Sequence, residues 1–229
     1  LKHLQKVNPA EVPLEIVEMV HYRKAEILYN MGDFDRAAEL FFDYREKCEA
    51  GTYRKCDFRD ESLEFMAIAF SDMPDGAEKA IKFFKRVGGR AYEDVVIYMV
   101  GFKNRTHGQY DDAIIALNAA LKRFPFYRDA PLAQQALIEC YLIKKKYDEA
   151  NEAREKLIDY YQPGTEWYQK NSDQKAVIEQ ANSQVKKALS SVAIYYHARA
   201  QKSKDKSLYE RALKRYLEFF DKFPGDKWR

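Results

Sequence analysis

The sequence predicts an all-α protein built from repeated pairs of antiparallel helices. A short phrase recurs in which an aromatic residue stands three positions before an alanine, as in Gly108-Gln109-Tyr110-Asp111-Asp112-Ala113. Apolar residues on both sides of each copy recur at spacings of three and four, which is the pattern of an amphipathic helix. The 9 glycines and 7 prolines among the 229 residues gather at the expected turns.

The first helix pair is expected over residues 15–31 and 35–48. Gly32 stands between the two patterns and is expected to end the first helix, because glycine adopts the left-handed conformation of a helix C-terminus at little cost. Asp33 or Asp35 is the expected N-cap of the second helix. Apolar residues at helical spacing mark the buried face of that helix, namely Ala37, Leu40, Phe41 and Tyr44.

The second and third pairs are expected at about residues 59–92 and 93–126. Asp60 is the expected cap at the start of the second pair, and Gly88-Gly89 ends that pair. Pro125 ends the third pair because proline cannot continue a helix. The apolar positions of these pairs include Leu63, Met66, Ala67, Phe70, Ala80, Phe84, Val87, Ile97, Val100, Ala113, Leu117 and Ala120.

The fourth pair is expected at about residues 130–163. Residues 165–170 are interpreted as a short irregular segment. A long helix then follows from about residue 172 to 201 and would span roughly 45 Å. It opens the fifth pair, residues 172–229, whose second helix follows a turn at Tyr209.

Together these positions resemble the tetratricopeptide repeat, a helix pair of about 34 residues. The resemblance implies a right-handed superhelical solenoid of about five antiparallel helix pairs, with one long extra helix before the last repeat. It implies a single array over residues 15–229, behind a polar leader at residues 1–14. Small residues would lie where two helices approach most closely, and turn aromatics would fill the gap between neighbouring pairs. The third repeat matches most fully, at Gly101, Gly108, Tyr110, Ala113, Leu117, Ala120 and Pro125.

Some phrases are similar to those of bacterial envelope tetratricopeptide proteins. Arg123-Phe124-Pro125 and Lys222-Phe223-Pro224-Gly225-Asp226 resemble the outer-membrane assembly and Tol–Pal-associated types. The segment from Trp167 to Gln201 is similar to the gliding-motility type. The resemblance implies a periplasmic or outer-membrane-associated location, and a cytoplasmic location is the alternative.

In this family the concave face is lined mostly by the first helix of each pair. Aligning the repeats on their turn glycines places ten residues on that face, at spacings that share one side of a helix. They include aromatic residues, an arginine and carboxylates, which are residue types common at protein interfaces. The alternative is that some of the aromatics are covered by the long helix or pack between repeats. The ten residues are Tyr22, Glu26, Tyr29, Asn30, Tyr98, Phe102, Arg105, Gln135, Glu139 and Leu142.

Cys48 and Cys56 flank a short loop that contains Gly51. They can form a disulfide in an oxidising compartment, and two free thiols are the alternative. The envelope resemblance favours the disulfide. Neither a CxxC spacing nor a Cys/His cluster is present, so no zinc site is expected.

Several other functions are not indicated. The formal charge of +3 is too small to imply nucleic-acid binding. No apolar run approaches the roughly 18 residues of a membrane span. The four histidines are scattered, and no catalytic or nucleotide-binding motif is present. We therefore expect no enzymatic activity, no cofactor and no metal.

The sequence thus favours a scaffold that binds a protein or peptide partner in a concave groove, within a bacterial cell-envelope complex. Because the chain begins at Leu1, we interpret it as part of a longer protein, whose signal or lipid anchor would lie outside it. One alternative is a cytoplasmic adaptor or regulator of the same fold. Another is a helical glycan-binding or enzyme-associated domain, which predicts an acidic pocket with aromatic platforms.

Overall fold

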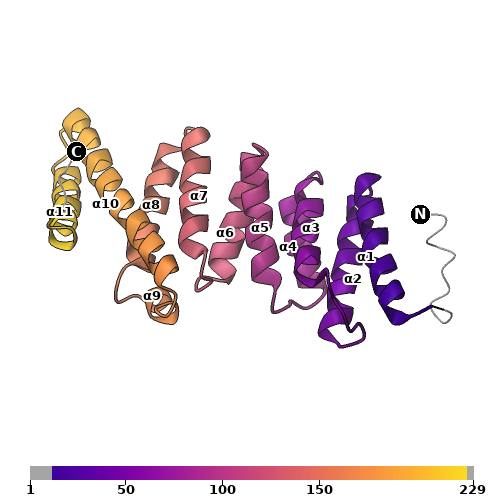
Figure 1. The fold of residues 1–229 in the computed structure, drawn as a ribbon. Helices are drawn as coiled ribbons and strands as arrows, with labels where there is room; N and C mark the ends of the chain where they lie inside the picture. Colours follow the sequence, from indigo (N-terminus) through magenta and orange to yellow (C-terminus); the bar gives the residue numbers. More distant parts are fainter. Residues whose placement is uncertain (1–11, 226–229) are drawn as a thin grey trace. The chain divides into compact units, whose positions relative to one another are not determined.

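A computed structural model describes residues 12–225, and in this range the chain forms eleven helices and no strand (Figure 1). The all-α prediction is confirmed, whereas most of the expected leader, residues 1–11, lies outside the described residues. None of the described helices has both the length and the apolar character that crossing a membrane requires. The helices are α1 Leu14–Asn30, α2 Phe34–Glu49, α3 Arg59–Ser71, α4 Gly76–Arg86, α5 Glu93–Thr106, α6 Tyr110–Arg123, α7 Ala130–Ile143, α8 Tyr147–Tyr161, α9 Glu166–Lys170, α10 Lys175–Ser203 and α11 Lys206–Lys222.

The chain divides into two compact units. The first ends at Ala119 and the second begins at Ala120, so the division falls within α6.

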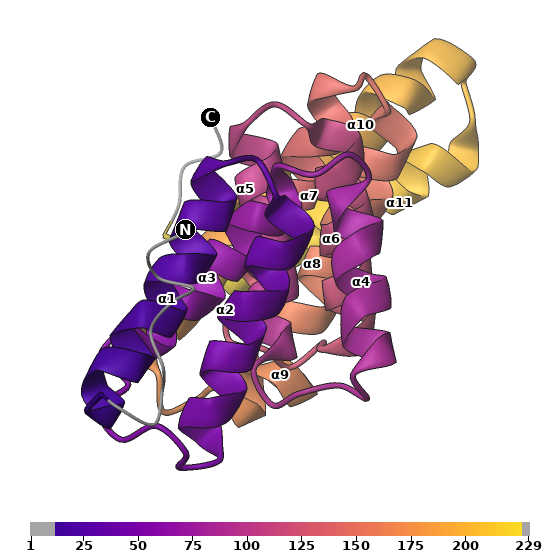
Figure 2. The same cartoon turned by 90° about the vertical axis from the view of Figure 1, so that its right-hand side faces the viewer.

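In unit 1, α1 packs against α2, α2 packs against α3, and α3 packs against both α4 and α5. Figure 2 shows α1 and α2 as a neighbouring pair at the front of this unit. The small residues that follow each turn are fully buried, because the two helices of a pair meet there: Ala37, Ala80 and Ala113 are all 0% exposed. Their position in the core agrees with the repeated phrase in the sequence.

The turns of unit 1 follow the expected glycine pattern, but the expected helix caps do not all form. Gly32 has φ of 78°, the left-handed conformation predicted for it, and Gly108 in the turn of the third pair has φ of 76°. Asp33 occupies the N-cap position of α2 without a side-chain capping hydrogen bond. The prediction that Asp60 caps the next helix is wrong. That helix already begins at Arg59, and the Asp60 carboxylate accepts a hydrogen bond from Arg45 instead.

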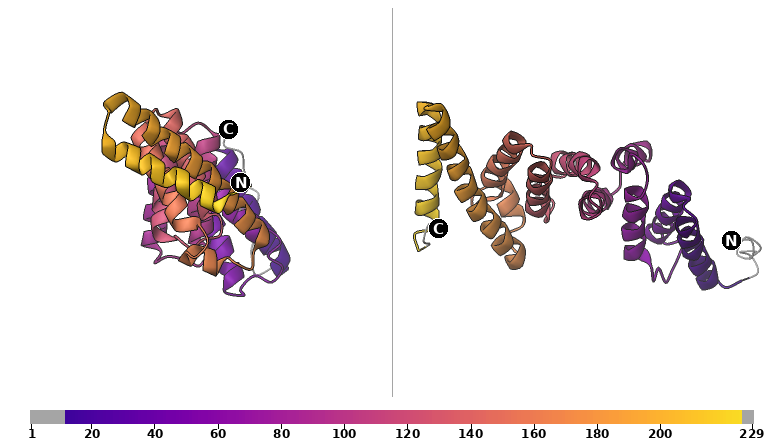
Figure 3. Two further views of the ribbon diagram at one scale, coloured as in Figure 1. Left: turned by 90° about the vertical axis from the view of Figure 1, so that its left-hand side faces the viewer. Right: turned by 90° about the horizontal axis from the view of Figure 1, so that it is seen from above.

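In unit 2, α7 packs against α8, and α10 packs against α7, α8 and α11. The views in Figure 3 show α10 and α11 lying side by side. With 29 residues, α10 confirms the prediction of a long helix at this place in the chain. The segment expected to be irregular contains the five-residue helix α9, where Thr165 Oγ1 accepts a hydrogen bond from the backbone N–H of Tyr168.

The turn aromatics behave differently from one pair to the next. The Phe34 ring lies 5.4 Å from the Tyr29 ring, within the first pair. In unit 2, Tyr147 is 56% exposed and Tyr209 is 38% exposed. Tyr147 is thus more than half exposed, and the expectation that it fills a gap between pairs is wrong. The Tyr209 ring meets His197 of α10 edge to face, with 6.1 Å between ring centres.

Candidate interaction groove

Unit 1 carries a hollow of about 1190 Å³, bordered by the end of α2, the first turns of α3 and α5, and the segment between α4 and α5. We call it the α2–α3–α5 groove. Its apolar lining comes from Leu63, Val95 and Met99, with Ala50 and Ala91. The groove opens to solvent, since the Asp60 side chain on its border is 89% exposed.

Charged side chains make up most of the remaining lining. Six carboxylates and three arginines border the groove, together with Tyr92. Several of the carboxylates lie in the first turns of α3 and α5, where negative charge is stabilised by the helix dipole. The carboxylates are Glu46, Glu49, Asp60, Glu61, Glu64 and Asp94, and the arginines are Arg45, Arg59 and Arg90.

Arg45 joins the end of α2 to the start of α3. Its side chain is only 8% exposed, and it forms ion pairs with Glu49 at 2.7 Å and with Asp60 at 3.0 Å. It also donates a hydrogen bond of 3.0 Å to the carbonyl oxygen of Arg59. The guanidinium lies 5.1 Å from the centre of the Tyr92 ring, in cation–π geometry. These contacts hold the guanidinium in one place on the groove wall.

Glu46 joins α2 to the segment that precedes α5. Its two carboxylate oxygens accept hydrogen bonds from Arg90 Nε and from the Tyr92 hydroxyl, both at 2.6 Å. Arg90 also donates to the carbonyl oxygens of Val87 and Gly89. Burial raises the pKa of Tyr92, and the hydrogen bond to Glu46 raises it further, so the phenol stays protonated as a donor. This second wall is therefore also fixed by charge-assisted hydrogen bonds.

The other three carboxylates are distributed over both sides of the groove. Glu64 of α3 forms an ion pair of 3.0 Å with Lys103 of α5. Glu61 is exposed on α3. Asp94 of α5 accepts a hydrogen bond of 2.7 Å from the backbone N–H of Val95, and burial raises the pKa of its carboxyl group.

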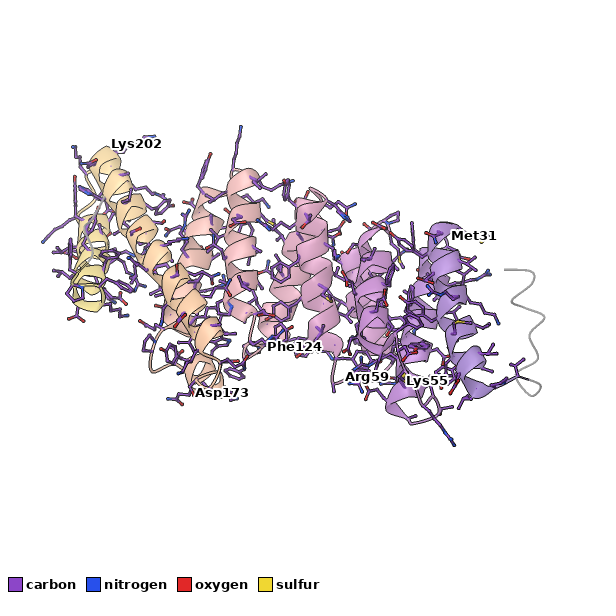
Figure 4. All side chains as sticks on the ribbon, viewed as in Figure 1. Met31, Lys55, Arg59, Phe124, Asp173 and Lys202 are labelled. Carbon is purple, nitrogen blue, oxygen red and sulfur yellow. A yellow bond between two sulfur atoms is a disulfide. The ribbon has the colours of Figure 1, made fainter. Side chains whose placement is uncertain are left out.

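A disulfide loop leads directly into the groove wall. Cys48 and Cys56 are joined by a disulfide bond, with their Cα atoms 5.8 Å apart. The loop lies at the end of the α1–α2 pair opposite to the turn at Met31, and Figure 4 labels Lys55 in the loop and Arg59 at the start of α3. A smaller hollow of about 400 Å³ lies beside the disulfide. Three of its lining residues also border the groove, namely Arg59, Asp60 and Glu61.

Two contacts from α1 hold this loop. Glu18 is only 3% exposed. Its carboxylate accepts hydrogen bonds from the backbone N–H groups of Arg54, Lys55 and Cys56. His21 Nδ1 lies 2.8 Å from the Tyr53 hydroxyl. The start of α3, and with it one side of the groove, is thus fixed relative to α1 and α2.

Two of the ten residues expected on the concave face lie in the core. Tyr22 is 0% exposed and Tyr98 is 1% exposed, so neither side chain is available to a partner. The Tyr22 ring stacks on Phe58 with 4.3 Å between ring centres and meets Phe41 edge to face. Tyr22 thus packs against α2 and against the residues at the start of α3, and Tyr98 is buried in the core.

The other eight residues are at least partly accessible. Glu26 forms an ion pair with Arg23, the Tyr29 hydroxyl donates to Asp72 at 2.6 Å, and Gln135 donates to Glu139 at 3.0 Å. Partner binding by these residues stays a prediction, and none of the ten lines the groove. Asn30 is exposed, and Phe102, Arg105 and Leu142 are partly exposed.

Sequence reasoning missed the groove because it assigned no partner-binding residues to the second helix pair. The available signal was the cluster of Asp60, Glu61 and Glu64 at the start of the helix that follows the cysteine loop. Among the described residues, no group of three or more His, Cys, Asp or Glu side chains is arranged to hold a metal ion. The groove is a candidate binding surface.

Comparison of the sequence with protein-family models and with curated proteins finds no match.

Proposed function

We propose that the chain is a tetratricopeptide-type interaction scaffold that holds part of a protein partner in the α2–α3–α5 groove. The observation that carries this proposal is the groove itself, a hollow of about 1190 Å³. Its lining combines charged side chains with the apolar residues Leu63, Val95 and Met99, which we call the apolar strip. Its walls are fixed before a partner arrives, because Arg45 and Glu46 each connect two segments through several hydrogen bonds. A preformed surface loses little conformational entropy on binding.

The packing order of the helices supports a stacked array of repeats within unit 1. In such an array each helix packs against the next one, and the first helices of successive pairs line one face. α3 packs against α5, which is the contact expected between first helices of neighbouring pairs. Gly101 of α5 approaches Leu117 of α6 so closely that a Cβ atom would lie 2.6 Å from Leu117 Cδ2.

The disulfide supports the proposed location in a bacterial cell-envelope complex. Disulfides persist in oxidising compartments such as the periplasm and are rare in the cytosol. The Cys48–Cys56 bond therefore favours the envelope over a cytoplasmic adaptor. Localising the full-length protein by cell fractionation tests this part of the proposal, and recovery from the cytosol would contradict it.

The glycan-binding or enzyme-associated alternative predicts exposed aromatic platforms beside carboxylates. The groove has the carboxylates, but its aromatic residue, Tyr92, is only 7% exposed. The Arg45 guanidinium covers the Tyr92 ring, and the hydroxyl is engaged by Glu46. This arrangement favours a polypeptide partner over a sugar.

Site-specific photocrosslinking in cells tests the scaffold proposal. A photoreactive amino acid at Met99, on the apolar strip, is expected to capture a partner protein covalently. The same amino acid at Lys85, which is exposed on α4 outside the groove lining, is the matched control. A partner captured equally at both positions, or only at Lys85, would rule out the groove as the binding surface.

A further inference from the structure

We propose that the α2–α3–α5 groove selects a cationic segment, in which Lys or Arg side chains accompany apolar ones. This inference rests on the proposed function and names the chemistry of the partner. The lining carries six carboxylates against three arginines, so it is net negative. The whole chain has a formal charge of +3, so the acidity of the groove is a local feature opposite in sign to the rest of the molecule.

Two of the three arginines of the groove cannot readily serve as anion receptors, because they are already engaged. The third, Arg59, has a side chain that is 51% exposed and lies 4.0 Å from Glu49 and 3.7 Å from Asp60. Arg45 is held by Glu49 and Asp60. Arg90 is held by Glu46 at 2.6 Å and by two backbone carbonyl groups. A partner carboxylate would have to break these contacts and approach the remaining negative charge. An acidic segment is therefore disfavoured by the groove.

The carboxylates of the lining that do not pair with Arg45 or Arg90 are Glu61, Glu64 and Asp94. Glu64 is shared with Lys103, whereas Glu61 and Asp94 supply negative charge from α3 and from α5. Asp94 is half-buried, and burial raises its pKa because its charge is poorly solvated. An ammonium or guanidinium group beside it would offset that cost by pairing with the carboxylate.

The apolar strip sets the second requirement. Val95 and Met99 are partly exposed among the carboxylates on the same lining, whereas Leu63 is only 6% exposed. Methionine is flexible and adapts to apolar side chains of different shape. A segment that presents apolar groups together with basic groups matches both parts of the lining, whereas a purely polar basic segment leaves the strip uncovered.

Fluorescence anisotropy with short labelled peptides tests the inference on the 229-residue chain. The peptides share one length and one set of Leu and Ser residues, and differ only in carrying Lys, Gln or Glu at the same positions. The Lys peptide is expected to bind about 10-fold more tightly than the Gln peptide, with the Glu peptide weaker still. Raising the salt concentration from about 50 to about 300 mM should remove most of this difference.

A pair of matched variants locates the effect. Combining Glu61→Gln with Asp94→Asn removes two groove charges, and the amide side chain introduced by the second change keeps an oxygen that accepts the Val95 hydrogen bond. This variant is expected to weaken binding of the Lys peptide about 5- to 10-fold. The control combines Asp75→Asn with Glu78→Gln, which removes the same number of negative charges at the start of α4, outside the groove lining. The control is expected to bind like the wild-type chain.

Three other results would overturn the proposal. Equal affinity for the Lys and Gln peptides, or equal weakening by both variants, would overturn the selection of a cationic segment by this groove. Failure of all three peptides to bind would overturn it as well. The scaffold proposal would still stand in these cases if Met99 captures a natural partner, so the two proposals fail by different experiments.

Discussion

Glu18 and Cys56 are 38 positions apart in the sequence, yet Oε2 of Glu18 accepts a hydrogen bond of 3.1 Å from the backbone N–H of Cys56. Cys56 has φ of 50°, a left-handed conformation that costs energy in a residue other than glycine. The Glu18 carboxylate also accepts hydrogen bonds from the backbone N–H groups of Arg54 and Lys55 in the same loop. These hydrogen bonds and the disulfide together hold the conformation of Cys56. One buried carboxylate of α1 thus shapes the path by which the chain enters α3.

Replacing Glu18 with Gln tests how much this anchor contributes. Gln provides one acceptor oxygen, and its NH₂ group would face a backbone N–H, so at least one charge-assisted hydrogen bond is lost. We expect the free energy of unfolding in urea to fall by about 2 kcal/mol. The control is Glu15→Gln, an exposed residue of the same helix that pairs with Lys55, for which a change below about 0.5 kcal/mol is expected. A similar decrease in the free energy of unfolding in both variants would show that the hydrogen bonds of Glu18 to the loop stabilise the fold no more than an exposed ion pair does.

His21 makes the stability of unit 1 depend on pH. Burial, assisted by the positive charge of Lys47, lowers its pKa from 6.5 to about 4. Between pH 4 and pH 6.5 the imidazole is therefore mostly neutral in the folded state and mostly protonated in the unfolded chain, so the unfolded chain binds more protons. The contribution is fully present above pH 6.5 and is lost as the pH falls towards 4. Over that window the free energy of unfolding should fall by up to about 3 kcal/mol from this group.

The measurement is urea unfolding at several pH values for the wild type and for His21→Gln. Carboxylates also titrate in this range, so the relevant quantity is the difference in slope between the two proteins. His21→Gln should flatten the dependence of the free energy of unfolding on pH. Parallel curves for the wild type and His21→Gln would show that His21 titrates normally.

The helices were predictable from the sequence because their signals are local. Gly32 and Gly108 mark turns by their own conformational freedom, and the apolar spacing of each helix is contained within it. The groove depends on contacts between distant segments, such as the Tyr92 hydroxyl with Glu46, and no local pattern encodes them. Tyr22 shows the same limit. Its position on the first helix fits a concave face, but Phe58 stacks on its ring and buries it.

Gly101 should tolerate no larger residue without a loss of stability. A Cβ atom there would lie 2.6 Å from Cδ2 and 2.7 Å from Cγ of Leu117, whose side chain is 0% exposed and has little room to move. Alanine raises helix propensity by about 1 kcal/mol, but overpacking of this kind costs about 1–3 kcal/mol. We expect Gly101→Ala to lower the free energy of unfolding by about 1 kcal/mol or more.

A double-mutant cycle identifies the clash as the cause. In a Leu117→Ala background the obstructing atoms are gone, so Gly101→Ala should become neutral or stabilising. A loss of the same size in both backgrounds would mean that Leu117 is not the obstacle.

Trp167 should anchor α9 in unit 2. The residue is 1% exposed, its indole Nε1–H donates a hydrogen bond of 2.8 Å to the carbonyl oxygen of Tyr127, and its ring meets Tyr161 edge to face at 5.3 Å. Asn171, at the end of α9, donates to the carbonyl oxygen of Phe126 at 3.2 Å. The short helix is thus tied at both ends to the segment between α6 and α7.

Trp167→Ala leaves a large cavity and an unpaired carbonyl group, so it should lower the free energy of unfolding by about 3–5 kcal/mol. Tyr168→Ala is the matched control, because Tyr168 is only half-buried in the same helix and should cost less than half as much. Denaturant unfolding followed by circular dichroism measures both losses. An effect at Trp167 no larger than that at Tyr168 would mean that α9 is held mainly by its backbone contacts, such as the Asn171 hydrogen bond, and not by the buried indole.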